Sequence, residues 1–108
     1  NGHPIQRLAN NANIMFEGAE SEAVVALLDK EGVFAASCTG IENESNAPSR
    51  TLLSMGKKPE WARSSVRFTF GLDFTKEDVD EVVEIIRKVV KKVRSISAVR
   101  IYRNKVEL

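Results

Sequence analysis

Two residues of this 108-residue sequence have side chains suited to chemistry, and a polar segment separates them. Cys38 is the only cysteine; as a thiolate it would be a nucleophile, given partial exposure and a cationic neighbour that lowers its pKa. Arg67 carries a guanidinium, whose planar fork matches a carboxylate and stays charged at any working pH. The sequence therefore offers a candidate nucleophile and a candidate carboxylate-binding group.

Both residues also have an ordinary structural interpretation. Cys38 could be a small buried hydrophobe at the end of a strand. Arg67 could be an exposed strand arginine that forms an ion pair with a nearby acid. From the residues alone, the ion pair is favoured for Arg67, and neither interpretation is favoured for Cys38.

The segment before Cys38 predicts a strand, a helix and a second strand. Alternating apolar and polar residues predict a partly buried strand over 12–17, after a turn-rich lead-in. An amphipathic helix follows, with Ser21 as its N-cap and Gly32 as the left-handed residue at its C-terminal end. The apolar run 33–37 then predicts a buried strand.

The segment after Cys38 predicts a polar loop, two short helices and the clearest strand. The loop covers 38–48, one helix opens at Pro48 and Ser49, and the other follows Pro59. In the strand over 65–70, Val66, Phe68 and Phe70 alternate with polar residues. Because successive strand residues point to opposite faces, we expect Arg67 to project away from the core.

The last third of the chain predicts a long helix. Thr75 and Asp78 resemble a capping pair, and apolar residues then recur every three or four positions up to Val93. Acidic residues crowd the first half and basic residues the second, an order that complements the helix dipole. No aromatic residues interleave the lysines, which favours a solvated face over a nucleic-acid patch. The pattern leaves the tail 96–108 as an edge strand or an arm.

Together these elements predict one α+β domain over 1–108: a small, mostly antiparallel sheet covered by helices, with a long C-terminal helix. The net charge of +1 and the lack of a long apolar run argue against nucleic-acid and membrane partners. A single cysteine is compatible with a reducing compartment, so we expect a cytoplasmic protein.

His3 and Cys38 are too few for a zinc site, and no metal is expected. We expect His3 to face solvent. Because the chain begins at Asn1, we expect a piece of a longer protein.

Five separated segments resemble the C-terminal small domain of the cysteine desulfurases, which are pyridoxal-phosphate (PLP) enzymes of fold type I. They are NGHPIQRLANNANIMFEG, LLDKEGVFAAS, PSRTLLSMG, SSVRFTFG and FTKEDVDEVVEII. The resemblance implies a small antiparallel sheet under helices that closes over the active site of a large PLP-binding domain. It also implies a homodimeric full enzyme that passes sulfur from L-cysteine to an acceptor or iron–sulfur scaffold protein.

The resemblance assigns roles to two positions of this sequence. Arg67 matches the family arginine that binds the carboxylate of the cysteine substrate, which reverses the preference for an ion pair. The family's nucleophilic cysteine, in a motif such as SSGSAC, aligns with Ile41, and Cys38 lies three positions earlier. Either the loop is re-registered so that Cys38 carries the persulfide, or the chain has lost sulfur transfer.

The resemblance places the PLP site outside this chain. PLP chemistry needs a lysine for the Schiff base, an acid against the pyridine nitrogen and a phosphate cradle. In the family these elements belong to the large domain, and no segment here resembles them. We therefore expect the isolated chain to hold no PLP and to be inactive. Two functions stay open: the small domain of a cysteine desulfurase, or a binding or scaffold module that kept the fold without the chemistry.

Overall fold

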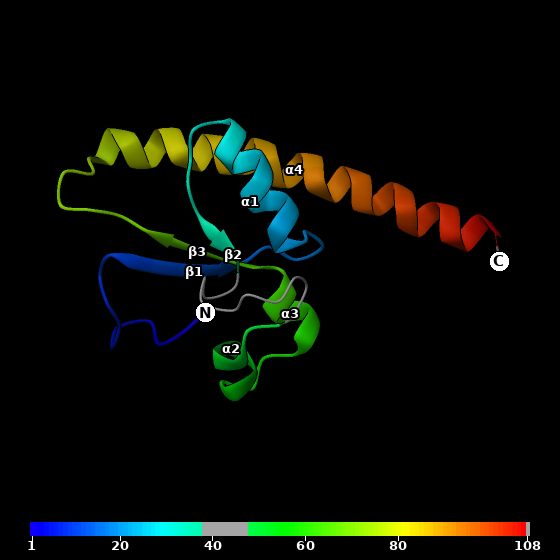
Figure 1. The fold of residues 1–108 in the computed structure, drawn as a ribbon, viewed down its shortest axis with the longest axis horizontal. Helices are drawn as coiled ribbons and strands as arrows, with labels where there is room; N and C mark the ends of the chain where they lie inside the picture. The colour runs from blue at the N-terminus through cyan, green and yellow to red at the C-terminus, as the bar shows by residue number, and fades with distance from the viewer. Residues whose placement is uncertain (38–47, 108) are drawn as a thin grey trace.

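The computed structural model describes the backbone of residues 1–37 and 48–107, and the side chains as far as residue 96. Three strands and four helices follow one another in this part of the chain (Figure 1). In chain order they are β1 (Asn11–Met15), α1 (Ser21–Lys30), β2 (Ala36–Ser37), α2 (Arg50–Ser54), α3 (Pro59–Arg63), β3 (Ser65–Thr69) and α4 (Lys76–Glu107).

The three strands form one antiparallel sheet in the order β1-β3-β2. β3 lies in the centre, so the strand with the clearest alternation has a neighbour on both sides. Its Arg67 is directly opposite Asn13 of β1 and Ala36 of β2. Partners in an antiparallel ladder point to the same face of the sheet, so the register decides which side chains surround Arg67. The predicted α+β fold with a small antiparallel sheet and a long C-terminal helix is confirmed.

The core lies on one face of the sheet, under α1 and α4 (Figure 1). Val66 of β3 is fully buried there, and Phe16 and Phe68 meet edge to face at its margin with ring centroids 6.3 Å apart. α2 and α3 lie on the other side of the sheet. The buried cluster consists of Ala19, Val24, Leu28, Val66, Val89, Val90 and Val93.

Local signals predicted several element ends correctly. The Ser49 hydroxyl caps α2 by accepting a hydrogen bond from the Leu52 N–H at 3.3 Å. Before α4, the Asp78 N–H donates to Thr75 Oγ1 at 3.1 Å, and the Thr75 N–H donates to Asp78 Oδ2 at 2.9 Å, so the predicted capping pair is confirmed. Gly32 has φ +84° after α1, as expected for a left-handed residue.

Three predictions about element ends were wrong. Ser21 is the first residue of α1 and is buried; Glu20 precedes the helix as N-cap without a side-chain hydrogen bond. Only Ala36–Ser37 of the run 33–37 pairs with β3, because β2 is a short edge strand, and Phe34 is 81% exposed. Phe70 lies beyond β3, where it stacks on Phe74 with ring centroids 5.5 Å apart.

The tail does not form an edge strand, because α4 continues through Glu107. Residues 76–107 contain neither glycine nor proline, so nothing in this stretch interrupts the helical hydrogen bonds. The helix runs past the end of the sheet toward the C-terminus (Figure 1). The predicted loop over 38–48 lies almost entirely outside the described residues. Among the described helices, none is both long and apolar enough to cross a membrane.

Candidate carboxylate-binding site

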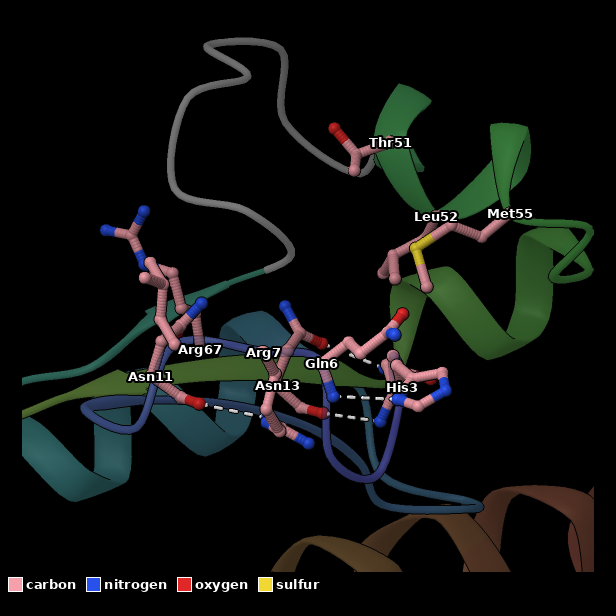
Figure 2. A pocket seen from close by; sticks show the side chains of 12 residues that line it. His3, Gln6, Arg7, Asn11, Asn13, Thr51, Leu52, Met55 and Arg67 are labelled. Carbon is pink, nitrogen blue, oxygen red and sulfur yellow. Dashed lines mark hydrogen bonds between the residues drawn. The ribbon is translucent and has the colours of Figure 1, made fainter.

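Arg67 stands on the face of the sheet that α1 and α4 leave uncovered. Val66 points into the core, so the pleat directs Arg67 to the opposite face, where the side chain is half-buried. Asn13 occupies the same face on β1 by register, and Figure 2 shows the side chains of Arg67 and Asn13 extending from the same side of the sheet. The predicted orientation of Arg67 is therefore confirmed.

Arg67 lines a pocket of about 390 Å³ between the sheet and two segments distant in sequence. One wall is the N-terminal lead-in, and the other is α2, which presents Thr51, Leu52 and Met55 (Figure 2). The floor comes from β1 and β3. The described lining consists of Asn1, Gly2, His3, Gln6, Arg7, Leu8, Asn11, Asn13, Thr51, Leu52, Met55 and Arg67.

Asn1 ties the lead-in to the sheet and to α3. Its amide Nδ2 donates to Asn13 Oδ1 at 2.8 Å and to Ser65 Oγ at 3.1 Å. Its amine donates to the Asn13 carbonyl at 2.8 Å. Trp61 Nε1 in turn donates to Asn1 Oδ1 at 2.5 Å. These bonds fix the amide of Asn13 beside Arg67.

Two further side chains shape the lead-in wall. His3 Nδ1 accepts hydrogen bonds from the backbone N–H of Ile5 at 3.1 Å and of Gln6 at 2.8 Å, which closes a tight turn. The expectation that His3 faces solvent is met, but the residue also holds this turn. Arg7 Nη2 donates to the Asn11 carbonyl at 2.9 Å, where β1 begins.

The charges around the pocket favour an anion. Its described lining contains two arginines and no carboxylate. The positive charges of Arg7 and Lys57 both act on the Asn1 nitrogen, so together they make the field at this wall positive. Within such a field the Arg67 fork can bind a carboxylate through charge-assisted hydrogen bonds.

The described pocket does not fit PLP by itself. Its lining has no lysine for a Schiff base and no acid to face a pyridine nitrogen. No group of three His, Cys, Asp or Glu side chains within the described residues could hold a metal ion. Cys38 and Ile41, the two candidate nucleophile positions, lie outside the described residues. Among the described residues, Arg67 is therefore the candidate group for binding an anion.

The sequence did not reveal the walls of this site. Asn13 lies beside Arg67 only through strand register, and Thr51 and Met55 only through the packing of α2. One local signal was available: the alternation of β1 places Ile14 on the face of Val66 and Asn13 on the opposite face, that of Arg67.

Comparison with known proteins places this geometry in context. The chain is 40% identical over 97 residues to a cysteine desulfurase IscS of Methanosarcina thermophila, a match that covers 90% of this chain and 24% of that protein. It is 37% identical over 97 residues to a cysteine desulfurase IscS 1 of Archaeoglobus fulgidus, covering 90% and 25%. The resemblance to cysteine desulfurases is confirmed.

The similarity concerns only part of those enzymes. A cysteine desulfurase IscS of Acinetobacter baumannii is also 40% identical, over 98 residues, and this chain again covers 24% of it. The chain thus spans about a quarter of the length of the curated relatives it matches, consistent with a C-terminal region of such an enzyme. No protein-family model matches the chain.

Proposed function

We propose that this chain supplies the substrate-carboxylate site of a cysteine desulfurase. The observation that carries the proposal is the position of Arg67: it lies on the sheet face opposite the core and lines a pocket whose described lining contains no carboxylate. A bidentate guanidinium–carboxylate pair gives both affinity and a fixed orientation of the substrate. Arg67 would therefore orient L-cysteine by its carboxylate, with the cysteine thiol left for transfer chemistry.

The PLP-binding elements belong to a large domain, either in the same polypeptide or in a separate chain. When bound there, PLP supplies the electron sink for cleavage of the carbon–sulfur bond. The full enzyme would be a homodimer that hands sulfur to an acceptor or iron–sulfur scaffold protein. We expect the 108-residue chain to be inactive alone, since the described lining of the pocket has neither the lysine nor the acid that PLP requires.

Carboxylate binding can be tested on the isolated chain by NMR. Titration with L-cysteine or 3-mercaptopropionate should shift the Nε–H resonance of Arg67, whereas cysteamine, which lacks the carboxylate, should not. Arg67→Lys keeps the charge but loses the fork, and should weaken binding by about 10- to 100-fold, as expected for a charged hydrogen bond worth about 1.5–3 kcal/mol. Arg63→Gln, on the exposed surface of α3 outside the pocket, is the matched control.

Two results would contradict the proposal. Equal shifts with L-cysteine and cysteamine would show that the carboxylate is not recognised. Release of sulfide from L-cysteine by the chain and PLP alone would show that no large domain is needed.

The role of Cys38 as persulfide carrier is the second part of the proposal. The alternative is a non-catalytic module, favoured by Ile41 at the family's cysteine position. A persulfide carrier needs an accessible thiolate, so fast labelling of Cys38 by a thiol reagent near neutral pH would support the carrier. Labelling that requires denaturant would favour the module instead.

A further inference from the structure

The amide of Asn13 is directly opposite Arg67 in the ladder between β1 and β3. Opposed residues of an antiparallel pair have Cβ atoms about 4.5–5.5 Å apart, and both side chains are half-buried and line the same pocket. Figure 2 shows Asn13 between Arg67 and the lead-in residues His3 and Gln6. An amide has an acceptor, Oδ1, and a donor, Nδ2, and only the donor suits a carboxylate. The direction of this amide therefore decides what an anion at Arg67 meets.

Trp61 and Ser65 fix the direction of the Asn1 amide. An indole N–H can only donate, and Trp61 Nε1 donates to Asn1 Oδ1 at 2.5 Å. Ser65 Oγ uses its hydrogen on the Trp61 carbonyl at 2.8 Å, so it acts as an acceptor from Asn1 Nδ2 at 3.1 Å. A reversed Asn1 amide would bring two donors together at the indole. Oδ1 of Asn1 must therefore face Trp61.

Asn1 in turn fixes the direction of the Asn13 amide. Asn1 Nδ2 donates to Asn13 Oδ1 at 2.8 Å, and a reversed Asn13 amide would set two NH2 groups against each other. Asn13 thus keeps its acceptor toward Asn1 and turns its donor, Nδ2, away from it. Nδ2 carries two hydrogens, so it can donate one to a ligand while the other keeps a bond within the chain.

The neighbouring amide of Asn11 has no such constraint. Asn11 lies two residues before Asn13, on the same face of β1, and lines the same pocket. Its Oδ1 is buried, and no group within the described residues donates a hydrogen bond to it. Of the two amides that β1 presents on this face, Asn13 is therefore the one whose polarity is set.

We propose that Asn13 Nδ2 is a second donor to the carboxylate that Arg67 binds, and that Trp61 sets the polarity of Asn13 through Asn1. This inference rests on the proposed function. A carboxylate has about four acceptor sites, and the guanidinium fork uses two of them. A third donor from a different strand adds both affinity and a fixed orientation. Asn13 contacts the substrate, whereas Asn1 and Trp61 are positioning residues that act through it.

NMR of the 108-residue chain tests the contact without a substitution in the site. The side-chain NH2 resonances of Asn13 are assigned by their absence from the spectrum of Asn13→Ala. Titration of the wild-type chain with 3-mercaptopropionate should move one of these two hydrogens downfield, since one of them donates to the carboxylate. Cysteamine should move neither. The Nε–H of Arg67, followed in the same spectra, reports separately on the proposed function.

The affinity for 3-mercaptopropionate measures what the contact contributes. Asn13→Ala should weaken binding by about tenfold or more, because it removes a hydrogen bond to a charged group. Asn10→Ala is the matched control: Asn10 is exposed, directly precedes β1 and lies outside the described lining of the pocket. Its loss should leave the affinity unchanged.

A double-mutant cycle tests the role of Trp61. Trp61→Phe keeps an aromatic ring but removes the indole N–H, and should weaken binding by about two- to tenfold, as for one neutral hydrogen bond. In the Asn13→Ala background the same change should have no further effect, because Trp61 acts through Asn13. A general structural role of Trp61 would lower the affinity in both backgrounds. Urea unfolding verifies that each variant is folded.

The outcomes separate this inference from the proposed function. If 3-mercaptopropionate shifts Arg67 but not Asn13, the second donor is refuted while the carboxylate site stands. If it shifts neither, both fall together. An equal loss of affinity in Asn10→Ala and Asn13→Ala would also refute the contact. Additive losses from Trp61→Phe and Asn13→Ala would refute the positioning role of Trp61.

Discussion

Replacement of Val66 by alanine tests which face of β3 is buried. The position of Arg67 on the opposite face depends on the answer. Val66 is 0% exposed and belongs to the core cluster under α1 and α4. The change removes two methyl groups, worth about 0.8 kcal/mol each by transfer, and leaves a small cavity that adds to the loss. We expect the free energy of unfolding to fall by about 2 kcal/mol.

The matched control is Thr69→Ala, on the same strand but on the side of Arg67. Thr69 is exposed, so its loss should change the free energy of unfolding by less than about 0.5 kcal/mol. Val66 and Thr69 differ in burial rather than in the strand they belong to. A difference between the two variants therefore reports on the face and not on β3 as a whole.

Urea unfolding measures both variants, followed by the fluorescence of Trp61, the only tryptophan, and by circular dichroism. With a slope of about 2 kcal/mol per molar urea, Val66→Ala should lower the midpoint by about 1 M. If Val66→Ala costs no more than Thr69→Ala, Val66 does not face the core. Arg67 would then not lie on the opposite face, and the carboxylate site would lose its geometric basis.

Three further substitutions test local features of the fold. Ser49→Ala removes the cap of α2 and should cost about 1 kcal/mol in urea unfolding, whereas Ser49→Gly should cost only a few tenths. Gly32→Ala has free space for a Cβ but must keep φ +84°, so a loss of about 1 kcal/mol should appear, with Gly32→Asn less affected. The Thr75 backbone N–H, and then its side chain, lower the pKa of Asp78 below its ordinary value of 3.8 by hydrogen bonding. The ionised carboxylate thus stabilises the fold above 3.8, and this contribution is lost as the pH falls through the lower, folded pKa. Thermal melts should show Asp78→Asn less stable than wild type at neutral pH, and the difference should shrink in strong acid.

Features encoded within one turn of chain could be predicted from the sequence. The Thr75–Asp78 pair and the cap at Ser49 each depend on residues three positions apart, so their patterns are visible without the fold. The alternation of β3 likewise predicted the two faces of the strand. Ser21 failed as an N-cap because burial, a tertiary property, placed it one position inside α1.

Features that depend on pairing could not be predicted in this way. The run 33–37 is apolar enough for a central strand, but only its last two residues find a partner, because β2 lies at the edge of the sheet. Phe34 consequently remains exposed. The prediction of an edge strand for the tail was wrong for a related reason. Apolar residues alternate in the tail, but α4 is already formed before it, and each further residue can extend this helix with its own backbone hydrogen bond.

The candidate site contains features of both kinds. The sequence could predict the one that is encoded locally and not the one that depends on tertiary contacts. Arg67 could be assigned from its strand and from the resemblance, because its direction follows from the pleat alone. The lead-in, in contrast, looked like an irregular segment with a solvent-facing histidine. In the structure it is a wall of the pocket, tied to the sheet through Asn1 and Asn13. Substrate orientation by Arg67 should therefore depend on residues 1–8 as well as on β3, since both segments line the same pocket.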